Sequence, residues 1–147
     1  MIDLKNQEAQ QQAMEAFFFG YQAFTTKADE MLERRGLGRV HQRIVFFIAR
    51  HPHLSVKELL ALLGVTKQAL NIPLRQLAEM GLVDSAASHT DKRMRLLQLT
   101  KEGSRLEQML RREQVKLLER AFGEAGEAAV AGWLAVNAAL GKIQHPT

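Results

Sequence analysis

Two short amphipathic helices joined by a tight glycine turn constrain the fold of this chain more than any other feature. Ser55 and Glu58 fit a capping box that starts the first helix, and its apolar residues are Leu59, Leu60, Leu62 and Leu63. Gly64 ends this helix, because glycine adopts a positive φ at low cost. Thr66 is a suitable N-cap for a second helix ending at Gly81, whose apolar residues recur three and four positions apart: Ala69, Leu70, Leu74, Leu77 and Ala78. So tight a turn between two helices predicts a helix-turn-helix.

The second helix has a polar face opposite this apolar stripe. The face carries side chains that can donate and accept hydrogen bonds, as base edges and phosphates require: Thr66 at the start, then Lys67, Gln68, Asn71 and Arg75. In a helix-turn-helix, these N-terminal residues would enter the DNA major groove. An ordinary solvated helix has a similar face, so the prediction of DNA reading depends also on the next segment of the chain.

A β-hairpin is predicted directly after these helices. Leu82 and Val83 begin one strand, residues 85–91 are small and polar, and a second strand is marked by Met94, Leu96, Leu97 and Leu99. The hairpin tip carries His89, Asp91, Lys92, Arg93 and Arg95. The two arginines are expected on one face of an extended strand, where a narrow minor groove would attract them. Asp91 can hold the Arg93 guanidinium by a charge-assisted hydrogen bond. Two helices followed by such a wing predict a winged helix.

These motifs together resemble the multiple-antibiotic-resistance regulator (MarR) family. The resemblance is carried by Gly81-Leu82-Val83, by Asp91-Lys92-Arg93 and by Leu99-Thr100-Lys101-Glu102-Gly103, and it covers nearly the whole chain. It implies a mainly α protein with a small β-wing, in which long N- and C-terminal helices form a homodimer. It also implies a transcription factor, usually a repressor of a pseudo-palindromic operator relieved by a small ligand or by oxidation, and not an enzyme.

Composition and charge fit this interpretation. Between residues 36 and 100 the chain has nine Lys or Arg against four Asp or Glu, so the basic excess falls on the predicted DNA-binding part. The chain contains no cysteine, which excludes disulfides, thiol catalysis and cysteine-based peroxide sensing. Polar residues interrupt the N-terminus and no apolar run is long enough to span a bilayer, so we expect a cytoplasmic location without a membrane partner.

Long helices are predicted on both sides of the winged helix. One covers about residues 7–35, a second 101–122 and a third 127–142, with Gly123 and Gly126 marking the break between the last two. The first and third are too apolar all round to be covered by one neighbouring face. We therefore expect residues 1–147 to form one domain, in which 36–100 bind DNA while 7–35 and 101–147 form the dimer.

A ligand pocket is expected where the terminal helices meet the winged helix. Its candidate residues are the aromatic walls Phe17, Tyr21, Phe24 and Phe47 (or Phe46). The MarR resemblance implies small aromatic or phenolic anions as one ligand class, and Arg43 (or Arg50) could pair with a carboxylate of such a ligand. Ordinary core packing explains each ring equally well. No metal or cofactor is expected, because His41, His51, His53 and His89 show no ligand spacing on a helix.

Pro73 conflicts with a regular second helix. Proline has no backbone N–H and its ring crowds the preceding turn. Either the helix kinks near 71–73, or it breaks and regular helix resumes with Pro73 in its first turn. The alternative function is a winged helix that binds protein instead of DNA. In that case Pro73 would be the sign that the second helix, the reader helix expected in the major groove, is disabled.

Overall fold

The computed structural model describes residues 2–145, so the ends of the predicted 1–147 and 101–147 segments lie outside the described residues. It has six helices and three short strands in this part of the chain: α1 (Gln7–Glu33), α2 (Arg39–Arg50), β1 (Leu54–Ser55), α3 (Val56–Leu63), α4 (Lys67–Glu79), β2 (Val83–Ala87), β3 (Arg95–Leu99), α5 (Lys101–Ala125) and α6 (Glu127–Gln144). The prediction of a mainly α winged helix with long terminal helices is confirmed. Within the described residues, no helix combines the length and apolar character needed to cross a lipid bilayer.

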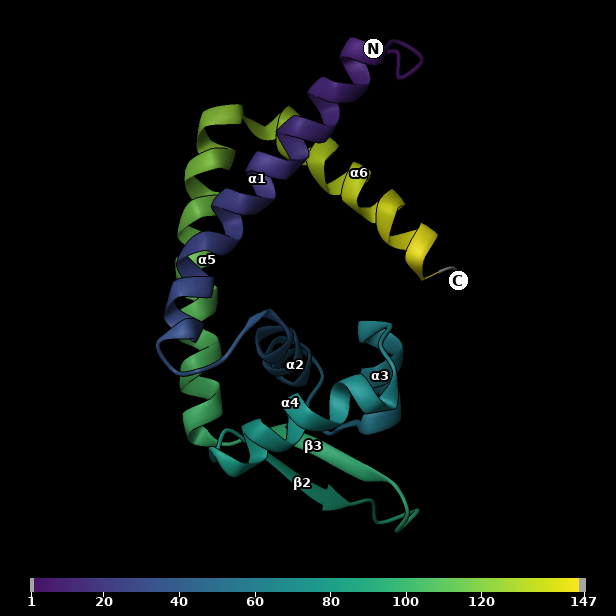
Figure 1. Ribbon diagram of the computed structural model, residues 1–147, viewed down its shortest axis with the longest axis vertical. Helices are drawn as coiled ribbons and strands as arrows, with labels where there is room; N and C mark the ends of the chain where they lie inside the picture. Colours follow the sequence, from purple (N-terminus) through teal and green to yellow (C-terminus); the bar gives the residue numbers. More distant parts are fainter. Residues whose placement is uncertain (1, 146–147) are drawn as a thin grey trace.

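Helix α5 runs along one side of the molecule and connects its two ends (Figure 1). The α2–α4 helices and the wing gather around the start of α5, and α1 lies along it. Helix α6 turns back from the far end of α5 after Gly126, whose φ is +93°. Gly123, predicted to help end α5, instead lies within the helix, because it adopts ordinary helical geometry and only Gly126 has the left-handed φ.

The helix-turn-helix forms as its local signals predict. The Ser55 hydroxyl accepts the Glu58 backbone N–H at 3.1 Å, while the Glu58 carboxylate accepts the Ser55 N–H at 3.2 Å. Gly64 ends α3 with φ +63°, and the Thr66 hydroxyl caps α4 by accepting the Ala69 N–H at 3.1 Å. Each of these bonds joins residues at most three positions apart, so local sequence is sufficient to specify them.

The wing is a three-stranded antiparallel sheet in the order β1-β3-β2, not the two-stranded hairpin that the sequence indicated. Leu54 of β1 pairs with Leu97 of β3, and both side chains are buried. Two residues are too few to show an alternating pattern, so β1 could not be predicted from periodicity. It joins the sheet to the start of α3.

Pro73 lies inside a continuous α4, so the structure excludes one of the two alternatives, the break with a new helix start. Its ring is buried on the inner face of the helix together with Leu70 and Leu77. Leu74 is only half-buried and Ala69 is exposed, so the buried stripe is rotated from the predicted one. Proline is tolerated here because its apolar ring fills a core position, which offsets part of the lost hydrogen bond.

The turn after α4 is clamped to the start of α5. Gly81 closes α4 with φ +73°, and its carbonyl accepts the Thr100 hydroxyl at 2.6 Å. The same hydroxyl accepts the Gly103 N–H at 3.0 Å, which caps α5, and the Thr100 N–H donates to the Leu82 carbonyl at 3.1 Å. A Cβ at position 103 would overlap that Leu82 carbonyl oxygen. The Leu-Thr-x-x-Gly run therefore has a packing reason for its threonine and its glycine.

The terminal helices leave much apolar surface uncovered within the chain. In α1 the buried residues are Thr25, Ala28 and Leu32 in the second half, and in α6 none is buried. The exposed large side chains of these two helices are Met14, Phe17, Phe18, Phe19, Tyr21, Trp133, Leu134, Val136, Leu140 and Ile143.

Candidate nucleic-acid interface

Helix α4 presents the predicted polar side chains to solvent. Its capped N-terminus and the following turns expose Thr66, Lys67, Gln68, Asn71 and Arg75, while the opposite side packs on the core. The salt bridges found within residues 2–145 do not involve Lys67 or Arg75. These two cations therefore remain available to phosphate groups.

A groove of about 230 Å³ separates α4 from the wing. Asn71 and Arg75 line it from the helix, and Asp84, Ser85 and Arg95 line it from the strands, above an apolar floor. Arg95 Nη2 donates to the Ser85 hydroxyl at 2.8 Å, which fixes the guanidinium across the sheet. The fold thus brings two reader-helix residues and one wing arginine, which are distant in sequence, around one groove.

The wing tip projects away from the helices (Figure 1). It exposes His89, Lys92 and Arg93, and the Arg93 side chain is 94% exposed. The predicted Asp91–Arg93 pair is confirmed: the carboxylate accepts the Arg93 backbone N–H at 3.0 Å and the guanidinium Nε–H at 3.5 Å. The first bond fixes the turn, while the second is long and exposed, so Arg93 is free to reorient toward a partner.

Arg93 and Arg95 do not share one face of a strand, so that prediction is wrong. β3 begins at Arg95, and Arg93 lies in the turn before it. Alternation with period two applies only inside the strand. The two arginines consequently have different places, one at the tip and one beside the groove.

Ser88 organises the wing tip and was missed in the sequence. Its side chain is buried, and its hydroxyl is 3.0 Å from the Thr90 hydroxyl and accepts the backbone N–H groups of Thr90 and Asp91 at 3.2 and 3.4 Å. Such serine turns are common in loops. The residue type alone, within a small polar segment, was too weak a signal to identify it.

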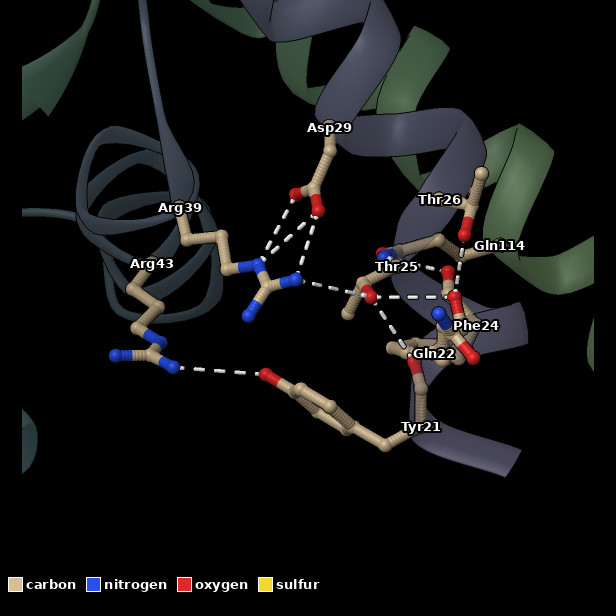
Figure 2. A network of polar contacts seen from close by, with 9 residues as sticks. All are labelled: Tyr21, Gln22, Phe24, Thr25, Thr26, Asp29, Arg39, Arg43 and Gln114. Carbon is tan, nitrogen blue, oxygen red and sulfur yellow. Dashed lines mark hydrogen bonds and ion pairs between the residues drawn. The ribbon is translucent and has the colours of Figure 1, made fainter. Parts of the chain in front are cut away.

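A polar network connects α1 to α2 near the predicted ligand pocket (Figure 2). The Arg39 guanidinium donates to the Asp29 carboxylate from Nη2 at 2.9 Å and from Nε at 3.1 Å. Through these hydrogen bonds and its charge, Asp29 raises the pKa of Arg39 above its usual value. Arg39 also lies 5.7 Å from the centre of the Tyr21 ring, whose hydroxyl accepts a long hydrogen bond of 3.5 Å from Arg43. Of the predicted pocket residues, the structure thus brings Tyr21 and Arg43 together.

A second contact of this junction reaches α5. Gln42 Nε2 donates to Gln114 Oε1 at 2.9 Å, and Gln114 Nε2 donates to the Phe24 carbonyl at 3.4 Å. Helices α1, α2 and α5 are therefore held by side-chain amides as well as by apolar packing. Phe17, by contrast, is 60% exposed.

A cavity of about 820 Å³ lies between α2, β3 and α5. Phe46, Arg50 and Gln98 line it, together with Glu107 and Arg111 of α5. Glu107 is buried and accepts the Arg111 Nε–H at 3.0 Å. The five residues chosen from the sequence (Phe17, Tyr21, Phe24, Arg43 and Phe47) are not among its lining, whereas the alternatives Phe46 and Arg50 are.

The histidines do not gather into a metal site. In the part of the chain that the structure describes, no group of three or more His, Asp or Glu side chains is arranged to hold a metal ion. His41 is buried between helices α2 and α4, and His51, His53 and His89 are exposed.

Comparison with known proteins identifies the family. A family model described as the MarR family matches residues 35–94, which contain the helix-turn-helix, β1, β2 and the wing tip and end just before β3. The chain is 43% identical over 133 residues to the HTH-type transcriptional regulator PetP of Rhodobacter capsulatus, covering 90% of this chain and 80% of that protein.

Solved structures share the fold at low sequence identity. Streptococcus pneumoniae FabT in complex with DNA superposes with a TM-score of 0.79 at 18% identity, covering 90% of this chain and 95% of that one. Staphylococcus aureus MarR in complex with salicylate and kanamycin gives a TM-score of 0.75 at 20% identity, covering 97% of each chain.

The winged helix with long terminal helices, the matching family model and the close relative lead to one conclusion. The chain belongs to the MarR family of DNA-binding winged helix-turn-helix transcription regulators. It is a regulator and not an enzyme.

Proposed function

We propose that the chain is a homodimeric repressor that binds a pseudo-palindromic operator in the cytoplasm and is released by a small ligand. The observation that carries the DNA-binding part is the intact reader helix. Helix α4 runs unbroken through Pro73 and exposes Lys67, Gln68, Asn71 and Arg75 beside an arginine-bearing wing. The protein-binding alternative depended on Pro73 disabling this helix, so the continuous helix removes its main support.

Two reader helices would be presented by a dimer built from α1, α5 and α6. Helices α1 and α6 leave many large apolar side chains exposed, and an exposed apolar face marks an interaction site. A second copy related by twofold symmetry would bury these apolar faces in both subunits. Twofold symmetry of the protein then predicts twofold symmetry of the operator.

The cavity between α2, β3 and α5 is the proposed ligand site. Its volume of about 820 Å³ falls in the range of small-molecule pockets. Phe46 offers an aromatic wall, and Arg50 can pair with a carboxylate. The solved MarR structure that contains salicylate supports an aromatic acid as the class of ligand to test. The cavity adjoins both α5 and the wing strand β3. A ligand bound there can therefore change the position of the wing relative to the dimerisation helices.

The experiment is operator selection followed by a salt titration. A duplex selected from a random library is compared with unselected duplex by fluorescence anisotropy at several salt concentrations. We expect preference for a twofold-symmetric sequence and a steep loss of affinity as salt rises, because phosphate contacts release counterions. No sequence preference and no salt dependence would favour the protein-binding alternative.

Two further measurements address assembly and release. Sedimentation at micromolar concentration is expected to give a dimer, and a folded monomer would contradict the proposed assembly. Salicylate titrated into the DNA complex is expected to lower operator affinity. Calorimetry that detects no aromatic acid bound to the protein would remove this form of ligand control.

A further inference from the structure

A partly buried hydrogen bond joins the buried His41 of α2 to the exposed Gln76 of the reader helix α4. His41 lies in the first turn of α2 and is buried, while Gln76 lies on α4, one position after Arg75. The distance between His41 Nε2 and Gln76 Oε1 is 2.7 Å. Thirty-five residues separate the two along the chain, and neither has a role in the proposed DNA contacts.

The other ring nitrogen fixes the direction of this hydrogen bond. His41 Nδ1 lies 2.9 Å from the backbone nitrogen of Gly38, which can only donate. Nδ1 must therefore be an acceptor, so in the neutral ring the proton is on Nε2. Nε2–H donates to Gln76, and Gln76 must offer its amide oxygen. One imidazole thus caps α2 and, at the same time, sets which side of the Gln76 amide faces inward.

The rest of the α4 packing is less directional. The buried contacts of α4 are made by Leu70, Pro73 and Leu77, and apolar contacts are less directional than a hydrogen bond. Pro73 also leaves the Ala69 carbonyl without the N–H that would normally bond it. The segment that carries Lys67, Gln68 and Asn71 is therefore the less firmly bonded part of the helix.

We propose that the His41–Gln76 hydrogen bond sets the rotation of the reader helix, so that Gln76 is a positioning residue for base recognition. It acts through α4 and does not itself contact DNA. Loss of the bond would let α4 populate orientations in which Asn71 and Arg75 miss their bases. Sequence-specific affinity would then fall with the fraction of correctly oriented helix, while phosphate attraction would persist.

Two variants of Gln76 of nearly equal size test this inference, which rests on the proposed DNA-binding function. Gln76→Met keeps the length of the side chain but has no good acceptor for His41 Nε2–H. Gln76→Glu is the matched control, because its carboxylate still accepts that hydrogen bond. Each full-length variant is titrated by anisotropy against the selected operator and against unselected duplex, and its melting temperature is recorded.

The decisive readout is the ratio of operator affinity to random-duplex affinity. For Gln76→Met we expect this ratio to fall about fivefold, the population shift that a hydrogen bond of ordinary strength supports. Random-duplex affinity should stay within a factor of about two, because no charge changes. For Gln76→Glu both affinities should fall together, through added negative charge, and the ratio should stay near that of the wild type.

Two outcomes would overturn the inference. An unchanged ratio in Gln76→Met would mean that the bond does not orient α4, and a lower melting temperature with both affinities reduced alike would then indicate a structural role only. An equal loss of ratio in Gln76→Glu would mean that the hydrogen bond is irrelevant. A wild-type protein without operator preference would instead refute the proposed function, and this inference with it.

Discussion

Replacing Gly103 by alanine should destabilise the protein. The new Cβ would overlap the Leu82 carbonyl oxygen and would lie 2.9 Å from the carbonyl carbon and 3.3 Å from Cα of the same residue. These are backbone atoms of the turn that joins α4 to the wing, so no flexible side chain can move aside. Either α5 or this turn must shift.

The magnitude follows from two effects. Forcing a methyl group into a closely packed site costs about 1–3 kcal/mol. A shift of α5 would also weaken the cap in which the Thr100 hydroxyl accepts the Gly103 N–H and donates to the Gly81 carbonyl, at about 1 kcal/mol. The free energy of unfolding should therefore fall by about 3 kcal/mol, and the melting temperature by about 10 °C for a chain of this size.

Gly123→Ala is the matched control, because Gly123 lies in the same helix with no atom near the added Cβ. It should be stabilising by about 0.5–1 kcal/mol through helix propensity. Both variants are melted by circular dichroism at one protein concentration, since a dimer melts in a concentration-dependent way. If Gly103→Ala melts within about 2 °C of the wild type, the clamp between α5 and the 81–82 turn is not the reason for glycine at this position.

Three further predictions concern the reader helix and the wing. Arg93→Ala should weaken operator binding by about 1–3 kcal/mol with little change in melting temperature, and unchanged affinity in anisotropy would exclude the wing tip from the interface. Pro73→Ala should raise the free energy of unfolding by about 1 kcal/mol, because a regained helix hydrogen bond outweighs the buried ring atoms that are lost; a clear drop in urea stability would show that packing prevails. Hydrogen bonds from the Ser55 hydroxyl and backbone amide lower the pKa of Glu58. The ionised carboxylate therefore stabilises the fold at pH values above its normal pKa, and this stabilisation is lost as the pH falls through the lowered pKa. Glu58→Gln keeps the capping bonds and should therefore lose less stability on acidification than the wild type in urea titrations; equal losses would mean that Glu58 does not contribute.

The sequence by itself determined the elements whose signals are local. Capping by Ser55 and Thr66, the glycine ends at 64 and 81 and the Asp91–Arg93 turn all join residues a few positions apart. Such interactions form in almost any tertiary context, so residue type and spacing are sufficient to predict them. The polar face of α4 was predictable for the same reason, since period 3.6 places its residues together.

Tertiary structure decided the contacts between distant segments. The pairing of β1 with β3, the burial of Pro73, the cavity between α2, β3 and α5, and the His41–Gln76 bond each depend on how separate elements pack. A two-residue strand has no periodicity, and a lone histidine or proline has no spacing to interpret. The place of Gly103 against the Leu82 carbonyl is of the same kind: the motif marked the residue, but only the approach of α5 to the turn explains why a side chain cannot fit there.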